Sequence, residues 1–200
     1  MGLKSSRGTL VLATLLVAVF VLEAALGFAG SEHALVLLGA LRTRDWSSAD
    51  WWRILTFSLL HLTWWHLAID TAGVLWLGTI VEGRFGSAAF AAIVLGGAAA
   101  SGAAAMLLGR FLPTTGIVVG SSGVVCGLLA AALMLAFLWS SHGAEDDQGL
   151  RRPLLICLIT VTGISFMPGV SLAGHLGGFA GGALTASMLK SPALQRTGSS

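Results

Sequence analysis

Long apolar runs with few charges constrain the fold of this chain more than any other feature. Of its 200 residues, 56% are hydrophobic and only 10% are charged, and the mean hydropathy is +0.88. A soluble domain carries charges on about a quarter of its residues, because its surface faces water. The chain is therefore predicted to form a single domain with lipid as its main solvent.

The apolar runs have lengths that suit membrane-spanning helices, which need about 20 mostly apolar residues each. We therefore predict an all-α membrane protein with six transmembrane helices. The predicted spans are roughly residues 10–29, 56–80, 87–108, 117–139, 153–168 and 171–189. A break at Met167-Pro168-Gly169 leaves little room between the last two spans, which predicts a tight hairpin.

Three parts are expected along the chain: a cytoplasmic N-terminus (1–9), a six-span domain (10–190) and a polar, disordered tail (191–200). Lys4 and Arg7 precede the first apolar run, a pattern that is also typical of a signal peptide. The run is too long for a signal peptide, so we predict that it is retained as the first span.

Basic residues near the span ends predict the orientation, because Lys and Arg concentrate on the cytoplasmic side. With both termini inside, seven such residues lie inside and four outside, which favours an N-in, C-in arrangement. The inside set is Lys4, Arg7, Arg84, Arg151, Arg152, Lys190 and Arg196, and the outside set is Arg42, Arg44, Arg53 and Arg110. Residues 30–55 then form a long outside loop with three tryptophans, which we expect to lie in the membrane interface; the alternative is a simple aromatic belt.

Several classes of function are excluded by composition. A net charge of +2 is too small for a nucleic-acid-binding protein. Cys126 and Cys157 lie in apolar runs, so neither a disulfide framework nor a metal site is predicted from them. Two histidines and Asp70 in the second span could hold a metal, but their spacing suits one helix face poorly. We predict no cofactor, no metal and no particular oligomeric state.

A serine and a histidine stand out, because polar groups inside a membrane are costly and usually functional. Ser122 lies in the run Gly120-Ser121-Ser122-Gly123 at the start of the fourth span, a run that alone is most often a turn with a helix cap. A serine becomes a nucleophile only with a base nearby. His175 is the lone histidine deep within another apolar span, and it is the candidate base.

Small residues indicate how the two could meet. Gly123, Gly127 and Ala131 form one stripe beside Ser122, and Gly174, Gly178 and Gly182 form another beside His175. Such stripes let membrane helices approach closely. We predict that this packing brings Ser122 and His175 within hydrogen-bond reach; the alternative is that the glycines only pack the helices.

His66 and Asp70 lie four residues apart and share a helix face, with His61 nearer the outer end of the span. An ion pair is the simplest interpretation, and an oxyanion site is the catalytic one.

The ordered set of motifs from about residue 46 to 185 resembles the rhomboid family of intramembrane serine proteases. It comprises Trp52-Arg53, Thr56, the His61/His66 spacing, Glu82 with Arg84 and Gly86, Gly120-x-Ser122-Gly123-x3-Gly127, and His175-x2-Gly178-x3-Gly182. The His-Leu-x-Trp-x-His pattern also resembles rhombosortases, which process proteins with a C-terminal Gly-Gly tail.

The resemblance implies a six-helix, rhomboid-like fold with a water-filled cavity open to the outer face, and a Ser122–His175 dyad. It implies an oxyanion site made by the Ser122 backbone N–H, His66 and position 70, beside Gly120 and Ser121. Trp52, Arg53 and Glu82 would support the first outside loop, and Gly178 and Gly182 would pack the last span on the fourth. The implied substrates are single-spanning membrane proteins cut near the outer surface at small residues. A bacterial inner membrane is the expected location.

Two positions depart from the family pattern. Asp70 stands where an asparagine is usual, and an ionised carboxylate cannot donate a hydrogen bond to an oxyanion. Asp70 either is protonated during catalysis or pairs with a charged His66 and helps indirectly; a triad acid on His175 is a third alternative. Cys126 stands where an aromatic residue often stacks on the catalytic histidine.

Two rival functions remain open at this point. A rhomboid-like pseudoprotease would bind client helices without cutting them, and Asp70 is the feature that favours this alternative. A small transporter could use buried acids such as Glu23 and Asp70, but the chain has no inverted repeat.

Overall fold

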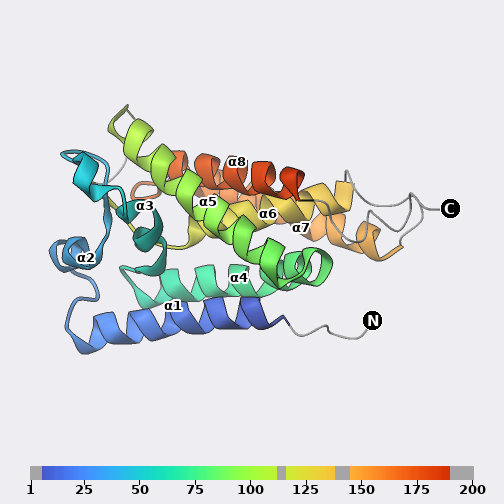
Figure 1. Cartoon of the computed structure of the whole chain (residues 1–200), viewed down its shortest axis with the longest axis horizontal. Coiled ribbons are helices and arrows are strands. Elements are labelled where there is room, and N and C mark those ends of the chain that lie inside the picture. Colours follow the sequence, from blue (N-terminus) through green and yellow to red (C-terminus); the bar gives the residue numbers. More distant parts are fainter. Residues whose placement is uncertain (1–5, 112–115, 138–144, 190–200) are drawn as a thin grey trace.

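The computed structural model describes residues 6–111, 116–137 and 145–189, and within them the fold is helical (Figure 1). The long helices are α1 (Arg7–Ala25), α4 (Trp64–Phe85), α5 (Ser87–Leu108), α6 (Ser122–Phe137), α7 (Glu145–Ile164) and α8 (Leu172–Met188). The short elements are α2 (Glu32–Leu38), β1 (Leu41–Arg42), η1 (Ser48–Asp50), α3 (Arg53–Thr56), η2 (Phe57–Leu59), η3 (Gly109–Phe111) and β2 (Ile117–Val118). The predicted tail, Lys4, Lys190 and Arg196 lie outside the described residues.

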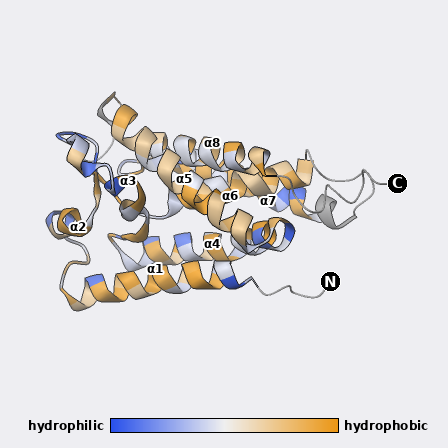
Figure 2. Cartoon of the chain, in the orientation of Figure 1, coloured by the Kyte–Doolittle hydropathy of each residue, from blue (hydrophilic) through white to orange (hydrophobic). Residues whose placement is uncertain are grey.

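The long helices present apolar side chains outward as well as inward. Among the described helices, α1 and α5 are long and apolar enough to cross a bilayer, and α6 is a shorter apolar helix. Figure 2 shows hydrophobic residues along nearly the whole of α1 and α5, and outward side chains such as Leu10, Val11 and Leu95 are more than half exposed. Apolar surface of this extent suits lipid rather than water.

The long helices pack into one bundle with two distinct ends. α5 packs along α8, and α6 packs against α4, α5, α7 and α8, while α1 lies on α4. The start of α1 lies beside the end of α4 and the start of α5, because Glu82 near the end of α4 bonds to residues of both other helices. The starts of α4, α6 and α8 lie at the opposite end, together with the short elements (Figure 1).

Glu82 closes the end of the bundle remote from the first outside loop. Its carboxylate accepts hydrogen bonds from Gly8 N (2.9 Å), Thr9 N (2.8 Å), Thr9 Oγ1 (2.8 Å) and Ser87 Oγ (2.6 Å). Four donors compensate the cost of burying a carboxylate. The expectation that Glu82 supports the first outside loop is wrong, because the residue lies near the C-terminal end of α4 and the loop lies at the other end.

Arg53 is the tether of the first outside loop. Its Nη1 donates to the carbonyl oxygens of Val36 (2.6 Å) and Ala40 (2.9 Å), and its Nε pairs with Asp50 (2.7 Å). The guanidinium also lies 4.6 Å from the centre of the Trp52 ring. Because one side chain joins four parts of the loop, the loop is a folded unit, and the expected supporting contacts of Trp52 and Arg53 are present.

Two further contacts join this loop to the rest of the bundle. The indole Nε1 of Trp46 donates to the carbonyl of Met106 near the end of α5 (3.2 Å). Strands β1 and β2 pair antiparallel, which connects the loop to the segment before α6. The loop is therefore more than an aromatic belt.

Hydropathy placed several helix ends incorrectly. The second span was expected to begin at residue 56, but α4 begins at Trp64, after Thr63, whose Oγ1 accepts from the N–H of His66 (3.4 Å). His61 consequently lies in the segment before the helix. The fourth span was expected from residue 117, but that segment pairs as β2 and α6 begins at Ser122. Gly120 intervenes with a φ of +113°, which side chains strongly disfavour.

The fifth span was also displaced, whereas the sixth, predicted as 171–189, agrees with α8 to within one residue at each end. α7 covers Glu145–Ile164 rather than residues 153–168, so the acidic cluster at 145–147 is helical rather than part of a loop. The predicted tight hairpin is confirmed, since only residues 165–171 separate α7 from α8.

Backbone contact between α6 and α8 brings the two helices together as predicted. A Cβ added to Gly178 would collide with the backbone of Gly123, with its Cα only 2.8 Å away. A Cβ added to Gly182 would likewise collide with the backbone of Gly127. Because backbone atoms cannot rotate aside, these positions accept glycine alone at the present helix separation.

We expect Gly178→Ala to lower the free energy of unfolding by about 1–3 kcal/mol, because the methyl group forces α6 and α8 apart. Gly83→Ala is the matched control, since a Cβ at Gly83 in α4 meets no atom within 4 Å. Thermal unfolding in detergent measures both variants. Equal melting temperatures for the two would contradict the close packing of α6 on α8.

Acid should loosen the first outside loop through Asp50. The N–H of Ser47 and the side chain of Arg53 hold the pKa of Asp50 below its usual value of about 4. A depressed folded-state pKa means that this stabilisation is present above the unfolded-state pKa and is lost as the pH falls through the folded-state value. Protection of residues 41–56 from hydrogen exchange should therefore fall below about pH 4.

Asp50→Asn should lose part of that protection already at neutral pH, whereas Asp45→Asn in the same loop should not. If Asp50→Asn matches the parent protein at neutral pH, Asp50 does not help Arg53 to hold the loop.

Candidate active site

The starts of α6 and α8 lie side by side at the loop end of the bundle. Ser122 is the first residue of α6. His175 lies in the first turn of α8, whose N-cap is Ser171, with its Oγ accepting from Gly174 N (3.1 Å). Caps of this kind fix where a helix begins, and so fix the side chains of its first turn.

The Ser122 hydroxyl and the His175 imidazole are in hydrogen-bond contact. Ser122 Oγ lies 2.9 Å from His175 Nε2, and the histidine is buried. This is the reach that the sequence predicted from the two glycine stripes. A serine hydroxyl whose proton can pass to an adjacent imidazole is suited to nucleophilic attack.

A second serine contacts the other nitrogen of the same imidazole. Ser165 Oγ lies 2.7 Å from His175 Nδ1 and donates to the carbonyl oxygen of Val161 (2.6 Å). Sequence reasoning did not identify Ser165. Its only signal is a polar residue at the end of an apolar span, and such residues are common where helices end.

The predicted oxyanion residues form one polar cluster around a single carboxylate oxygen. Asp70 Oδ2 accepts from Ser121 Oγ (3.1 Å) and lies 3.3 Å from His61 Nε2 and 3.5 Å from His66 Nε2. The two imidazoles meet edge to face, with ring centres 5.2 Å apart. From the sequence, His61 was predicted to lie in the same span as His66 and Asp70. In the structure His61 lies before the start of α4 and contacts Asp70 from that segment, so helical spacing does not describe their relation.

Gly120 brings the chain against His66 just before the candidate nucleophile. A Cβ at Gly120 would lie 2.6 Å from His66 Nε2. Its N–H donates to the carbonyl of Phe57 in η2 (3.1 Å). The N–H of Ser122, two residues further along at the start of α6, has no acceptor within its own helix, and a helix start attracts negative charge.

Glu23 extends the polar cluster toward α1. Its Oε2 accepts from the backbone N–H of His61 (3.3 Å), and the side chain is fully buried. Glu23 thereby fixes the segment that carries His61. Within the described residues, no three His, Cys, Asp or Glu side chains are placed to hold a metal ion.

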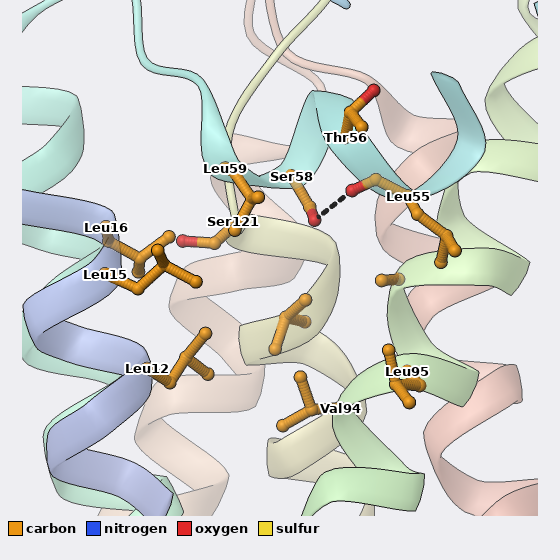
Figure 3. A pocket seen from close by; sticks show the side chains of 12 residues that line it. Leu12, Leu15, Leu16, Leu55, Thr56, Ser58, Leu59, Val94, Leu95 and Ser121 are labelled. Atoms are coloured by element: carbon orange, nitrogen blue, oxygen red, sulfur yellow. Dashed lines mark hydrogen bonds between the residues drawn. The ribbon is translucent and has the colours of Figure 1, made fainter. Parts of the chain in front are cut away.

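A cavity of about 260 Å³ lies between α1, α3, η2, α5 and α6, and Ser121 is one of the residues that line it (Figure 3). Its walls are mainly leucine and valine side chains, among them Leu12, Leu16 and Val94. Its serine hydroxyls are used within the protein, because Ser58 donates to the Leu55 carbonyl (2.6 Å) and Ser121 donates to Asp70. This cavity therefore does not offer the groups that hydrolysis requires, and the candidate site is the Ser122–His175 pair.

Comparison with known proteins indicates the family to which the chain belongs. A family model described as a rhomboid domain matches residues 48–192. Rhomboid protease GluP of Bacillus subtilis is 31% identical over 174 residues, which cover 86% of this chain and 32% of that protein. Rhomboid-like protease 3 of Toxoplasma gondii is 26% identical over 152 residues, or 76% of this chain and 57% of that protein. RHOMBOID-like protein 7 of Arabidopsis thaliana is 31% identical over 140 residues, or 69% and 42%.

The chain spans about a third to somewhat over half the length of these relatives. The family model nevertheless matches most of the chain, including Ser122, His175 and the residues around Asp70 other than Glu23. The apolar helices agree with an integral membrane protein. The chain therefore belongs to the rhomboid family of intramembrane serine proteases.

Proposed function

We propose that this protein is an endopeptidase that cuts membrane proteins within the bilayer, with Ser122 as nucleophile and His175 as general base. The observation that carries the proposal is the 2.9 Å contact between Ser122 Oγ and His175 Nε2. The family membership supports the same reaction.

Each chemical step is assigned to a residue. His175 Nε2 takes the proton of Ser122 as Oγ attacks the peptide carbonyl, and a tetrahedral oxyanion forms. The Ser122 backbone N–H and the His66 side chain stabilise that oxyanion. His175 then gives its proton to the leaving amine, and water, activated by the same histidine, hydrolyses the acyl-enzyme.

Asp70 acts in this proposal as an acceptor that orders its neighbours. Ser121 Oγ donates to Asp70 Oδ2, and the nearest nitrogens of His61 and His66 face the same oxygen. A protonated Asp70 acting as oxyanion donor would leave those contacts without their best acceptor. The 3.5 Å separation from His66 Nε2 is longer than a normal hydrogen bond, so the His66 donor remains available to an oxyanion.

We further propose that the six long helices are six spans, with both termini in the cytoplasm. The start of α1 and the end of α8 then lie inside, and Ser122 lies near the outer membrane surface. Single-spanning proteins cut at small residues are the proposed substrates, and those with a Gly-Gly tail are the subtype to test. A bacterial inner membrane is the proposed location.

The second candidate is a pseudoprotease that binds client transmembrane helices without cutting them. Asp70 is the observation that favours it, because an ionised carboxylate beside the oxyanion would oppose the reaction unless its neighbours offset the charge.

A serine-directed fluorophosphonate should label the purified protein, and Ser122→Ala should abolish both labelling and cleavage of a model transmembrane substrate. Ser121→Ala is the adjacent control, and it should still label at a reduced rate because the nucleophile remains. Gel fluorescence and substrate cleavage report the two outcomes. A wild-type protein that binds the substrate but shows neither labelling nor cleavage would favour the pseudoprotease.

The role of Asp70 is tested by the ratio of wild-type to Asp70→Asn cleavage rates across pH. If Asp70 works as an ionised acceptor, the ratio should fall toward acid, because only the carboxylate of the wild type is neutralised by protons. Titration of His175 affects both proteins and largely cancels. A ratio that rises toward acid would instead identify a protonated Asp70 that donates to the oxyanion.

A further inference from the structure

We propose that Ser165 is a positioning residue that selects the tautomer of His175 and holds its ring toward Ser122. This inference rests on the proposed function, because it concerns how the general base is prepared for the reaction. A neutral imidazole carries its proton on one nitrogen only, and the partner of one nitrogen decides what the other can do.

The donor and acceptor roles follow from the Val161 carbonyl. A carbonyl oxygen can only accept, so the 2.6 Å contact requires the Ser165 hydroxyl to donate its proton to Val161. The lone pairs of Ser165 Oγ then remain to accept from the Nδ1–H of His175 at 2.7 Å. With the proton on Nδ1, Nε2 presents its lone pair to Ser122 Oγ.

The opposite tautomer would disable the base. A proton on Nε2 would point at Ser122, and Nδ1 would need a donor that Ser165 has already directed to Val161. The hydrogen bonds can therefore form in one order only: Ser122 donates to His175 Nε2, His175 Nδ1–H donates to Ser165, and Ser165 donates to the Val161 carbonyl.

The backbone of Ser165 is fixed as well as its hydroxyl. Its N–H donates to the carbonyl of Val161 (3.0 Å), which continues the hydrogen-bond pattern of α7 by one residue. The side chain is buried, and Cys126 on α6 provides no ring on which His175 could stack. Among the described side chains, Ser165 is the hydrogen-bond partner of His175 Nδ1.

The kinetic test compares Ser165→Ala with Ser165→Thr, which keeps the hydroxyl. Ser58→Ala is the matched control, because Ser58 is 6% exposed against 5% for Ser165 and its Oγ also donates to a backbone carbonyl at 2.6 Å. Ser165→Ala should lower kcat about 10- to 100-fold with little change in KM, as is typical when the orienting partner of a functional histidine is removed. Ser165→Thr should recover most of kcat, and Ser58→Ala should behave as the wild type.

Nitrogen-15 NMR of histidine-labelled protein provides a readout that does not require activity. In the Ser122→Ala background, His175 should show the Nδ1–H tautomer, and adding Ser165→Ala should shift the population toward Nε2–H. Should Ser165→Ala fail to fold, Ser165→Cys keeps the size while weakening the acceptor, and the same shift is expected.

The outcomes separate the two proposals. A Ser165-dependent tautomer in a protein that never labels with fluorophosphonate would overturn the protease function alone. An active enzyme whose kcat and tautomer do not change in Ser165→Ala, or whose His175 carries its proton on Nε2, would overturn the role of Ser165 alone. A loss of kcat that Ser165→Thr does not recover, with the tautomer unchanged, would also overturn it.

Discussion

Backbone contact between α6 and α8 is the constraint on which the candidate site depends. Ser122 and His175 lie on different helices, 53 residues apart, and they meet only because Gly178 and Gly182 lie directly against Gly123 and Gly127. In lipid, apolar side chains provide little drive for helix association, so close van der Waals contact takes a larger share. The same glycines that stabilise the pair of helices therefore set the distance between nucleophile and base.

The buried carboxylates of Glu82 and Asp70 each gather a polar cluster, and the two clusters lie at opposite ends of the bundle. At one end the carboxylate of Glu82 accepts four hydrogen bonds from donors of α1 and α5. At the other, Asp70 accepts a hydrogen bond from Ser121 and lies 3.3 Å from His61 Nε2, whereas His66 Nε2, 3.5 Å away, remains available as a donor. The Glu82 cluster therefore stabilises the fold, whereas the proposed role of the Asp70 cluster depends on the donor that His66 keeps available. A buried carboxylate thus supports the fold at one end of the bundle and orders the candidate site at the other.

Sequence patterns predicted the features that depend on residues close in the chain or on one repeated spacing. The glycine stripes and the serine and histidine beside them were predictable because small-residue spacing directly determines helix contact. Glu82 was misplaced because its supporting role was carried over from the resemblance, although the predicted topology already put Arg84 inside and the loop outside. The start of α4 was misjudged because hydropathy cannot register the cap at Thr63. Ser165 could not be found because its role exists only where the ends of α7 and α8 converge.

The two sides of the site are positioned by different parts of the fold. The Ser122–His175 pair depends on the helices, whereas the oxyanion side depends on the first outside loop. The segment that follows this loop reaches the site through Phe57, whose carbonyl accepts from Gly120 and so keeps the chain against His66. Arg53, four residues earlier in the chain, joins the end of the loop to Val36 and Ala40. A disturbance of the loop is therefore expected to change the proposed oxyanion stabilisation while leaving the Ser122–His175 contact intact, so the proposed reaction would slow although its nucleophile and base stay in place.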